Sequence, residues 1–166
     1  MKKSNKKRIS IVTRNTNETK INVKVELDGK GNNSISTGLP FFDHMLEQLS
    51  KHSLINIELS CIGDLKVYAH HTMEDCGLAL GNAIKKALGD KKGIRRYSFN
   101  YLPMDECLTR CCQDISGRPW LIWNVFLPNI SIKDIETEIF REFFQSLSKA
   151  AGFTIHIENL LSLIHI

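Results

Sequence analysis

The most specific chemical signal in the sequence is the run His70-His71-Thr72-Met73-Glu74. On a helix, positions i and i+4 lie on one face, so His70 and Glu74 can bind the same ion. His71 is rotated by about 100° from His70, so the adjacent histidines suit two metal ions better than one. Imidazole nitrogen with carboxylate oxygen favours manganese, iron or zinc over calcium or magnesium. The alternative is a pair of surface histidines at the start of a helix.

A second helix, predicted at residues 41–51, adds another histidine to the candidate ligands. His44, Gln48 and His52 are spaced at i, i+4 and i+8, which places them on one face. A polar stripe of this kind is more than solvation of a short helix requires, although His52 alone is equally compatible with a surface role. The opposite face carries apolar residues that we expect to be buried: Met45, Leu46 and Leu49.

Two arginines are the best candidates for binding an anion. Arg118 lies in Ser116-Gly117-Arg118-Pro119, where glycine and proline fix a corner of the backbone, and Arg96 is the first residue of a predicted strand. A guanidinium group matches the oxygens of a phosphate, and two would hold a phosphomonoester. Each arginine alone is more often a surface ion-pair partner. Glu18 lies between two predicted strands, and its local sequence indicates little more.

The elements that must position these residues follow from hydrophobic periodicity. Ile21, Val23, Val25 and Leu27 alternate with polar residues, which predicts a half-buried strand. The turn residues 28–33 are predicted to close a hairpin with residues 34–37. The remaining strands are predicted near 55–60, 65–68, 96–102, 106–115, 121–126 and 153–157. Helices are predicted at 41–51, at 72–88, where Gly89 ends the helix, and near 136–150.

Two blocks of the sequence can be superimposed with an offset of 98 residues. The helix containing His44 and the strand 11 residues later match the helix containing Glu142 and the strand 11 residues after it. This indicates an internal duplication, with half-domains at residues 9–92 and 93–166. The counterpart of His70 would fall near position 168.

Composition is that of an ordinary globular protein, with 166 residues, 42% of them hydrophobic, and a net charge of +4. Residues 1–8 are expected to form a basic, flexible N-terminus without the aromatic residues typical of nucleic-acid binding. No apolar run is long enough to span a bilayer. The five cysteines match no disulfide or zinc framework, which favours reduced thiols in a cytoplasmic protein.

Together these motifs resemble the imidazoleglycerol-phosphate dehydratase family, and the resemblance runs from about Arg8 to about Ile157. The motifs that carry it are Arg14-Asn15-Thr16-Asn17-Glu18-Thr19, Phe41-Phe42-Asp43-His44-Met45-Leu46, His70-His71-Thr72-Met73-Glu74-Asp75, Leu102-Pro103-Met104-Asp105-Glu106 and Ser116-Gly117-Arg118-Pro119. The resemblance implies an α+β fold of duplicated half-domains like domain 2 of ribosomal protein S5, each a mixed or antiparallel sheet backed by helices. It also implies a large homo-oligomer with two Mn²⁺ ions per site and active sites between subunits.

The family reaction is the dehydration of imidazole glycerol phosphate to imidazole acetol phosphate in histidine biosynthesis. By resemblance, His44 and His71 would bind one metal ion, and His70, Glu74 and Glu142 the other. Many family members have histidine at the Glu142 position. Two Lewis-acidic ions would favour the imidazolate form of the substrate, and a carboxylate such as Glu18 would move the proton. The residues expected to contact substrate are Glu18, from a neighbouring subunit, Gln48, His52, Arg96 and Arg118.

One part of the family pattern is not found in this sequence. The family has a second His-His-x-x-Glu on a final helix, and residues 160–166 stand where the turn leading to it would be. We therefore expect a second half-domain without its final helix, with low activity and low stability. The alternative is a truncated, non-catalytic remnant with weakened metal binding. A small metal-dependent hydrolase would explain neither the order of the motifs nor the paired arginines.

Overall fold

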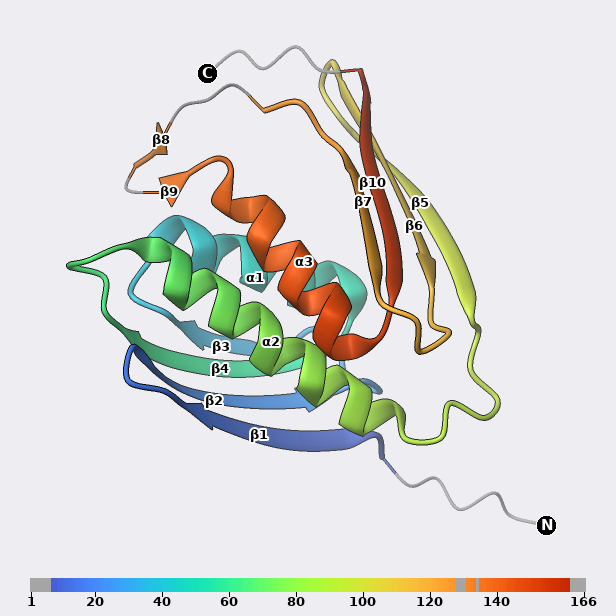
Figure 1. Cartoon of the computed structure of the whole chain (residues 1–166). Coiled ribbons are helices and arrows are strands. Elements are labelled where there is room, and N and C mark those ends of the chain that lie inside the picture. The colour runs from blue at the N-terminus through green and yellow to red at the C-terminus, as the bar shows by residue number, and fades with distance from the viewer. Residues whose placement is uncertain (1–6, 128–130, 134, 162–166) are drawn as a thin grey trace.

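Two four-stranded sheets enclose a layer of helices in the computed structural model (Figure 1). The structure describes residues 7–127, 131–133 and 135–161. Residues 1–6 of the predicted basic N-terminus and residues 162–166 of the predicted atypical ending lie outside the described residues. No helix in the described part is long and apolar enough to cross a membrane.

The first half of the chain forms one sheet and two helices. Its elements are β1 (Ile9–Asn15), β2 (Thr19–Glu26), β3 (Asn33–Ser36), α1 (Pro40–Ser53), β4 (Asn56–Gly63) and α2 (Ala69–Leu88). The strand order is β1-β2-β4-β3, antiparallel except for the parallel pair β3–β4. The alternation predicted for β2 is confirmed, because Ile21, Val23 and Val25 are buried against the helices.

The second half repeats this arrangement. Its elements are β5 (Tyr97–Met104), β6 (Cys107–Asp114), β7 (Trp120–Asn124), the short strands β8 (Ser131–Ile132) and β9 (Ile135–Glu136), α3 (Ile139–Ala151) and β10 (Thr154–Leu161). The strand order is β5-β6-β10-β7, again with one parallel pair, β7–β10. The predicted duplication is confirmed, and Ile57 of β4 and Ile155 of β10 are 98 residues apart in equivalent strands. Among the described residues of this half, no helix corresponds to α2.

Two predicted elements are wrong. Residues 34–37 do not form a hairpin with β2, because β4 lies between them and β3 pairs with β4 instead. The side-chain oxygen of Asn56 accepts hydrogen bonds from the backbone N–H groups of Lys30 (2.8 Å) and Asn32 (2.9 Å), which holds the loop at the start of β4. Residues 65–68 form a turn rather than a strand, with the Val67 N–H donating to the Asp64 carbonyl at 2.7 Å.

Helices α2 and α3 run side by side at close range between the two sheets (Figure 1). Two glycines on α2 make this approach possible. A Cβ atom at Gly77 would lie 2.6 Å from the carbonyl oxygen of Phe143, and one at Gly81 would lie 2.7 Å from that of Leu147. Because these contacts are with the α3 backbone, a side chain cannot be accommodated by rotamer changes alone. The two halves of the fold are therefore joined through a glycine face of α2.

Replacing Gly77 or Gly81 by alanine should destabilise the chain, although alanine favours helix more than glycine does. Forcing α3 outward should cost about 1–3 kcal/mol of unfolding free energy, as for other overpacked sites. Urea unfolding would measure the change. The matched control is Asn82→Ala at an exposed position of α2, which should leave stability equal or slightly higher. Unchanged stability in both glycine variants would contradict the close packing of the α3 backbone against Gly77 and Gly81.

Candidate active site

The first turns of α2 present one pair of metal-ligand candidates. The Nε2 atom of His70 lies 3.4 Å from Oε2 of Glu74, and both side chains are partly exposed. Two ligand atoms of a single tetrahedral ion, each bonded at about 2.1 Å, lie about 3.4 Å apart. The distance between the two side chains predicted to pair from the i, i+4 spacing is therefore the distance that binding one ion requires. An imidazole nitrogen and a carboxylate oxygen are also suitable ligands for such an ion.

His71 belongs to a different pair. Its Nδ1 lies 3.0 Å from Oδ2 of Asp64, in the turn between β4 and α2. This hydrogen bond raises the pKa of His71 above its ordinary value. Metal-binding histidines commonly donate one ring N–H to a carboxylate, which orients the other nitrogen for the ion. Sequence reasoning missed Asp64, because Gly63-Asp64 indicated only a turn.

Glu18 lies in the exposed turn between β1 and β2, near the start of α2. The negative charge of Glu18 helps to raise the pKa of His71, although Asp64 has the larger effect. Glu18 and His71 of the same chain therefore lie within electrostatic range of each other. A role for Glu18 towards substrate in a neighbouring subunit stays a prediction.

Helix α1 presents its predicted polar stripe to solvent. The Oε1 of Gln48 and Nε2 of His52 are 3.2 Å apart, and His44 is exposed on the same helix. The expectation that Met45 and Leu49 are buried is wrong, because they are 37% and 41% exposed. The buried face of α1 is narrower than predicted and consists of Phe42, Leu46 and Ser50.

The five predicted ligands do not converge in one chain. Glu142 lies on α3, where its Oε1 is 3.6 Å from Nη1 of Arg141 and its side chain lines an open pocket with Trp123 and Thr137. Within residues 7–127, 131–133 and 135–161, no three His, Cys, Asp or Glu side chains are close enough to hold a metal ion. The structure thus brings together His70 with Glu74 and His71 with Asp64, but adds neither His44 nor Glu142 to either pair.

The two predicted phosphate-binding arginines share one carboxylate. Asp114, at the end of β6, accepts hydrogen bonds from Nε (2.6 Å) and Nη2 (3.0 Å) of Arg96. Nη2 of Arg118 lies 3.7 Å from the same carboxylate, and the Arg118 side chain is 75% exposed. Arg96 lowers the pKa of Asp114, with a smaller contribution from Arg118. Asp114 therefore binds the Arg96 guanidinium group through two hydrogen bonds and lies within ion-pair distance of the exposed Arg118, which the strand pattern of the sequence could not indicate.

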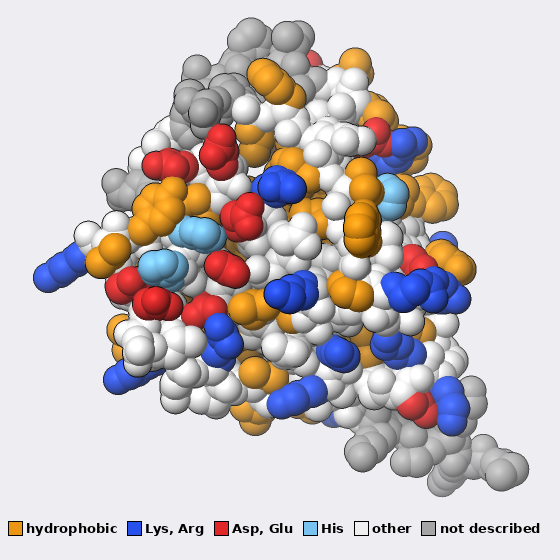
Figure 2. Space-filling view, in the orientation of Figure 1, with side chains coloured by type: hydrophobic (Ala, Val, Ile, Leu, Met, Phe, Trp, Pro, Cys, Tyr) orange, Lys and Arg blue, Asp and Glu red, His pale blue; other side chains and the backbone are white. Residues whose placement is uncertain are grey.

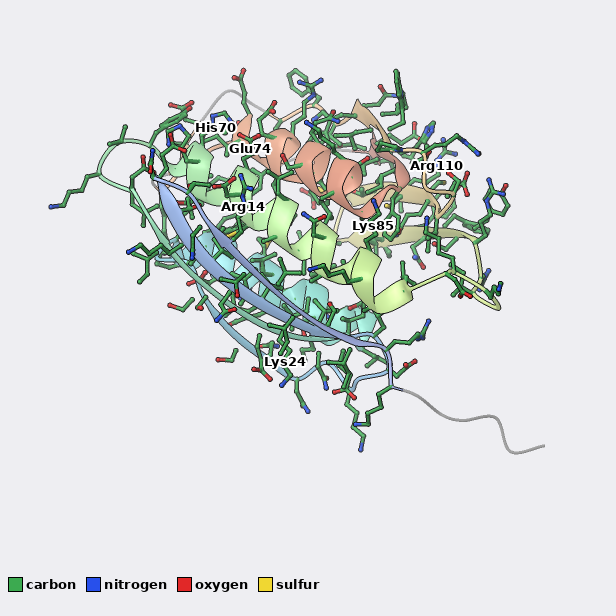
Figure 3. All side chains as sticks on the ribbon, turned by 60° about the horizontal axis from the view of Figure 1, so that its bottom comes forward. Arg14, Lys24, His70, Glu74, Lys85 and Arg110 are labelled. Atoms are coloured by element: carbon green, nitrogen blue, oxygen red, sulfur yellow. The ribbon has the colours of Figure 1, made fainter. Side chains whose placement is uncertain are left out.

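These arginines and the α2 histidines lie at opposite ends of α2. The helix has 20 residues, which corresponds to about 30 Å. His70 and His71 are in its first turn, whereas Lys91, just after its last turn, lies beside Gly117 in the corner that carries Arg118. Figure 2 shows two histidine side chains ringed by acidic side chains over the start of α2. In Figure 3, His70 and Glu74 lie at one end of α2 and Lys85 lies towards the other.

The fold and this donor set define a two-half α+β protein with imidazole and carboxylate groups at the start of its central helix. Comparison with known proteins identifies the family. The family model described as imidazoleglycerol-phosphate dehydratase matches residues 37–163. The chain therefore belongs to the imidazoleglycerol-phosphate dehydratase family of hydro-lyases.

The similarity extends over most of the chain. An imidazoleglycerol-phosphate dehydratase from Cereibacter sphaeroides (strain ATCC 17025) is 55% identical over 147 residues, covering 89% of this chain and 75% of the relative. One from Agrobacterium fabrum is 53% identical over 148 residues, covering 89% and 75%. The crystal structure of the enzyme from Staphylococcus aureus has a TM-score of 0.83 and 33% identity, covering 93% of this chain and 85% of that one. The shared fold confirms the duplicated α+β architecture.

Replacing Arg96 by alanine should raise the pKa of Asp114 towards its ordinary value. The ion pair lowers the pKa of Asp114 in the folded state. It therefore stabilises the fold fully at pH values above the unfolded-state pKa of the carboxyl group. This stabilisation is lost as the pH falls through the lower, folded-state pKa. A carboxyl NMR titration in acid would measure the shift. Arg95→Ala, at the neighbouring exposed arginine, is the control and should leave the titration unchanged. An unshifted Asp114 in the Arg96 variant would show that the pair does not persist in solution.

Proposed function

We propose that this chain dehydrates imidazole glycerol phosphate to imidazole acetol phosphate, a step of histidine biosynthesis in the cytoplasm. We further propose that it acts as a homo-oligomer with active sites between subunits. The observation that carries this proposal is the separation of the histidines from the arginines by the length of α2, about 30 Å. A glycerol phosphate chain is far too short to connect an imidazole at one end of α2 to a phosphate at the other. The histidine end of one subunit would therefore meet the arginine end of another.

The residues at the start of α2 fit a manganese site. His70 and Glu74 would hold one Mn²⁺ ion together with Glu142, and His71 would hold the other together with His44. Because neither His44 nor Glu142 reaches these residues within the described part of one chain, both would come from a neighbouring subunit, with the remaining ligands from substrate. When bound, the ions would supply Lewis acidity at the substrate imidazole. Asp64 would keep the His71 ring oriented, because its carboxylate occupies Nδ1 and leaves Nε2 for the metal.

The other predicted residues have distinct parts in this reaction. Dehydration removes a proton from one carbon and a hydroxyl group, as water, from its neighbour. Glu18 would take the proton as a general base in the active site of a neighbouring subunit, a role supported by its exposed position in the turn between β1 and β2. Arg118 would bind the substrate phosphate with its free N–H groups, beside the Arg96 guanidinium that Asp114 orients. Gln48 and His52, joined at 3.2 Å, would line the substrate site.

The test measures turnover of imidazole glycerol phosphate with added Mn²⁺, together with Mn²⁺ binding by calorimetry. His70→Ala and His71→Ala should each lower turnover by more than about 100-fold, because loss of a ligand exceeds the 10–100-fold effect of outer-shell partners. His156→Ala, at an exposed histidine of β10, is the matched control and should retain turnover and binding. A chain without Mn²⁺-dependent turnover would support the non-catalytic alternative instead. Binding that is insensitive to both His70 and His71 would remove them from the metal site.

A further inference from the structure

Asp75, the residue after Glu74 in α2, is a buried carboxylate with an unusually complete set of partners. It is 7% exposed. Nε and Nη2 of Arg14, near the end of β1, donate to its Oδ1 at 2.9 Å and 2.7 Å. Figure 3 shows Arg14 at the same end of α2 as His70 and Glu74. A buried charge needs this degree of pairing, since an unpaired one would be costly.

The other oxygen of Asp75 binds the turn that carries Glu18. The hydroxyl of Thr19, which is 1% exposed, donates to Oδ2 at 2.5 Å, and that of Thr16 lies 3.5 Å from the same atom. The Thr16 hydroxyl oxygen in turn accepts the backbone N–H groups of Glu18 (3.2 Å) and Thr19 (2.9 Å). The turn is closed by the Thr16 N–H donating to the Thr19 carbonyl at 2.8 Å.

We infer that Asp75 is a positioning residue that fixes the Glu18 turn against the start of α2, where His70, His71 and Glu74 lie. Its two oxygens join the end of β1 and the beginning of β2 to the helix, so the backbone on both sides of Glu18 is held from one point. The role of Glu18 in the reaction rests on the proposed function, whereas the hydrogen-bonded link is independent of it. A small displacement of a reacting group can lower a rate by about 100-fold, so the link would be felt in turnover.

The chain contains a matched control for this ion pair. Arg8 and Asp28 form a second two-point arginine–aspartate pair at the opposite end of the β1–β2 hairpin, with Nη2–Oδ1 at 2.6 Å and Nε–Oδ2 at 3.0 Å. Asp28→Asn therefore breaks an exposed two-point arginine–aspartate pair beside the open end of the same hairpin without touching the Glu18 turn. Asp75→Asn removes one charge and keeps the size of the side chain.

Two measurements on the full chain test the inference. In Asp75→Asn, hydrogen exchange at the Glu18 and Thr19 amides should accelerate by at least about 10-fold through local opening of the turn. The kcat should fall by about 10–100-fold, as for other positioning partners, while KM stays nearly constant. Asp28→Asn should change neither. A purely structural role of Asp75 would lower the stability of Asp75→Asn but leave its turnover per folded molecule unchanged.

Thr19→Val keeps the test decisive if Asp75→Asn does not fold, because it removes one hydroxyl bond and keeps the Arg14–Asp75 pair. It should accelerate exchange in the same turn and lower kcat. Unchanged exchange at Glu18 in the folded variants would overturn the inference, as would equal losses of kcat in Asp75→Asn and Asp28→Asn. A wild-type chain without turnover would contradict the proposed function, and the exchange rates alone would then decide the role of Asp75.

Discussion

The close contact between α2 and α3 at Gly77 and Gly81 is the constraint on which the rest of the structure depends. Helices α1 and α2 cover the first sheet and, among the described residues, α3 covers the second, so the two halves are joined where α2 and α3 approach to backbone distance. A side chain at either glycine would meet a carbonyl oxygen of α3. The contact therefore fixes where α2 lies relative to both sheets, and with it the position of every functional side chain on or beside α2.

Fixed in this way, α2 acts as a spacer between two chemically different ends. Its first turns carry imidazole and carboxylate groups. Two further carboxylates bind residues near them: Asp64 is hydrogen-bonded to His71, and Asp75 is hydrogen-bonded to the turn that contains Glu18. Its other end leads to the segment where Asp114 gathers two guanidinium groups. Among the described residues, the candidate phosphate ligands Arg96 and Arg118 lie at the opposite end of α2 from His70, His71 and Glu74. This division gives a physical reason for assembling the site from more than one copy of the chain.

Much of the fold could be predicted from the sequence, because periodic burial fixes β2 and α2 and the 98-residue offset relates the two halves. The pairing of β3 could not, since it depends on β4, which enters the sheet later in the sequence. Among site residues, the pairing of His70 with Glu74 follows from helical spacing. Asp64 and Asp114 were missed because a turn aspartate and a strand aspartate show no local sign of the distant histidine or arginine that they bind. The predicted ligands His44 on α1 and Glu142 on α3 join neither the His70–Glu74 pair nor the His71–Asp64 pair within one chain, and their placement relative to a metal ion stays a prediction.

Subunit complementation tests the central claim, that metal and phosphate groups meet only between chains. One variant would carry His70→Ala and His71→Ala, and the other Arg96→Ala and Arg118→Ala. Each alone should be nearly inactive. After unfolding and refolding together in equal amounts, the mixture should recover about a quarter of the wild-type turnover, because each interface draws its two sides from different subunits. A mixture no more active than its two components would contradict a site shared between subunits.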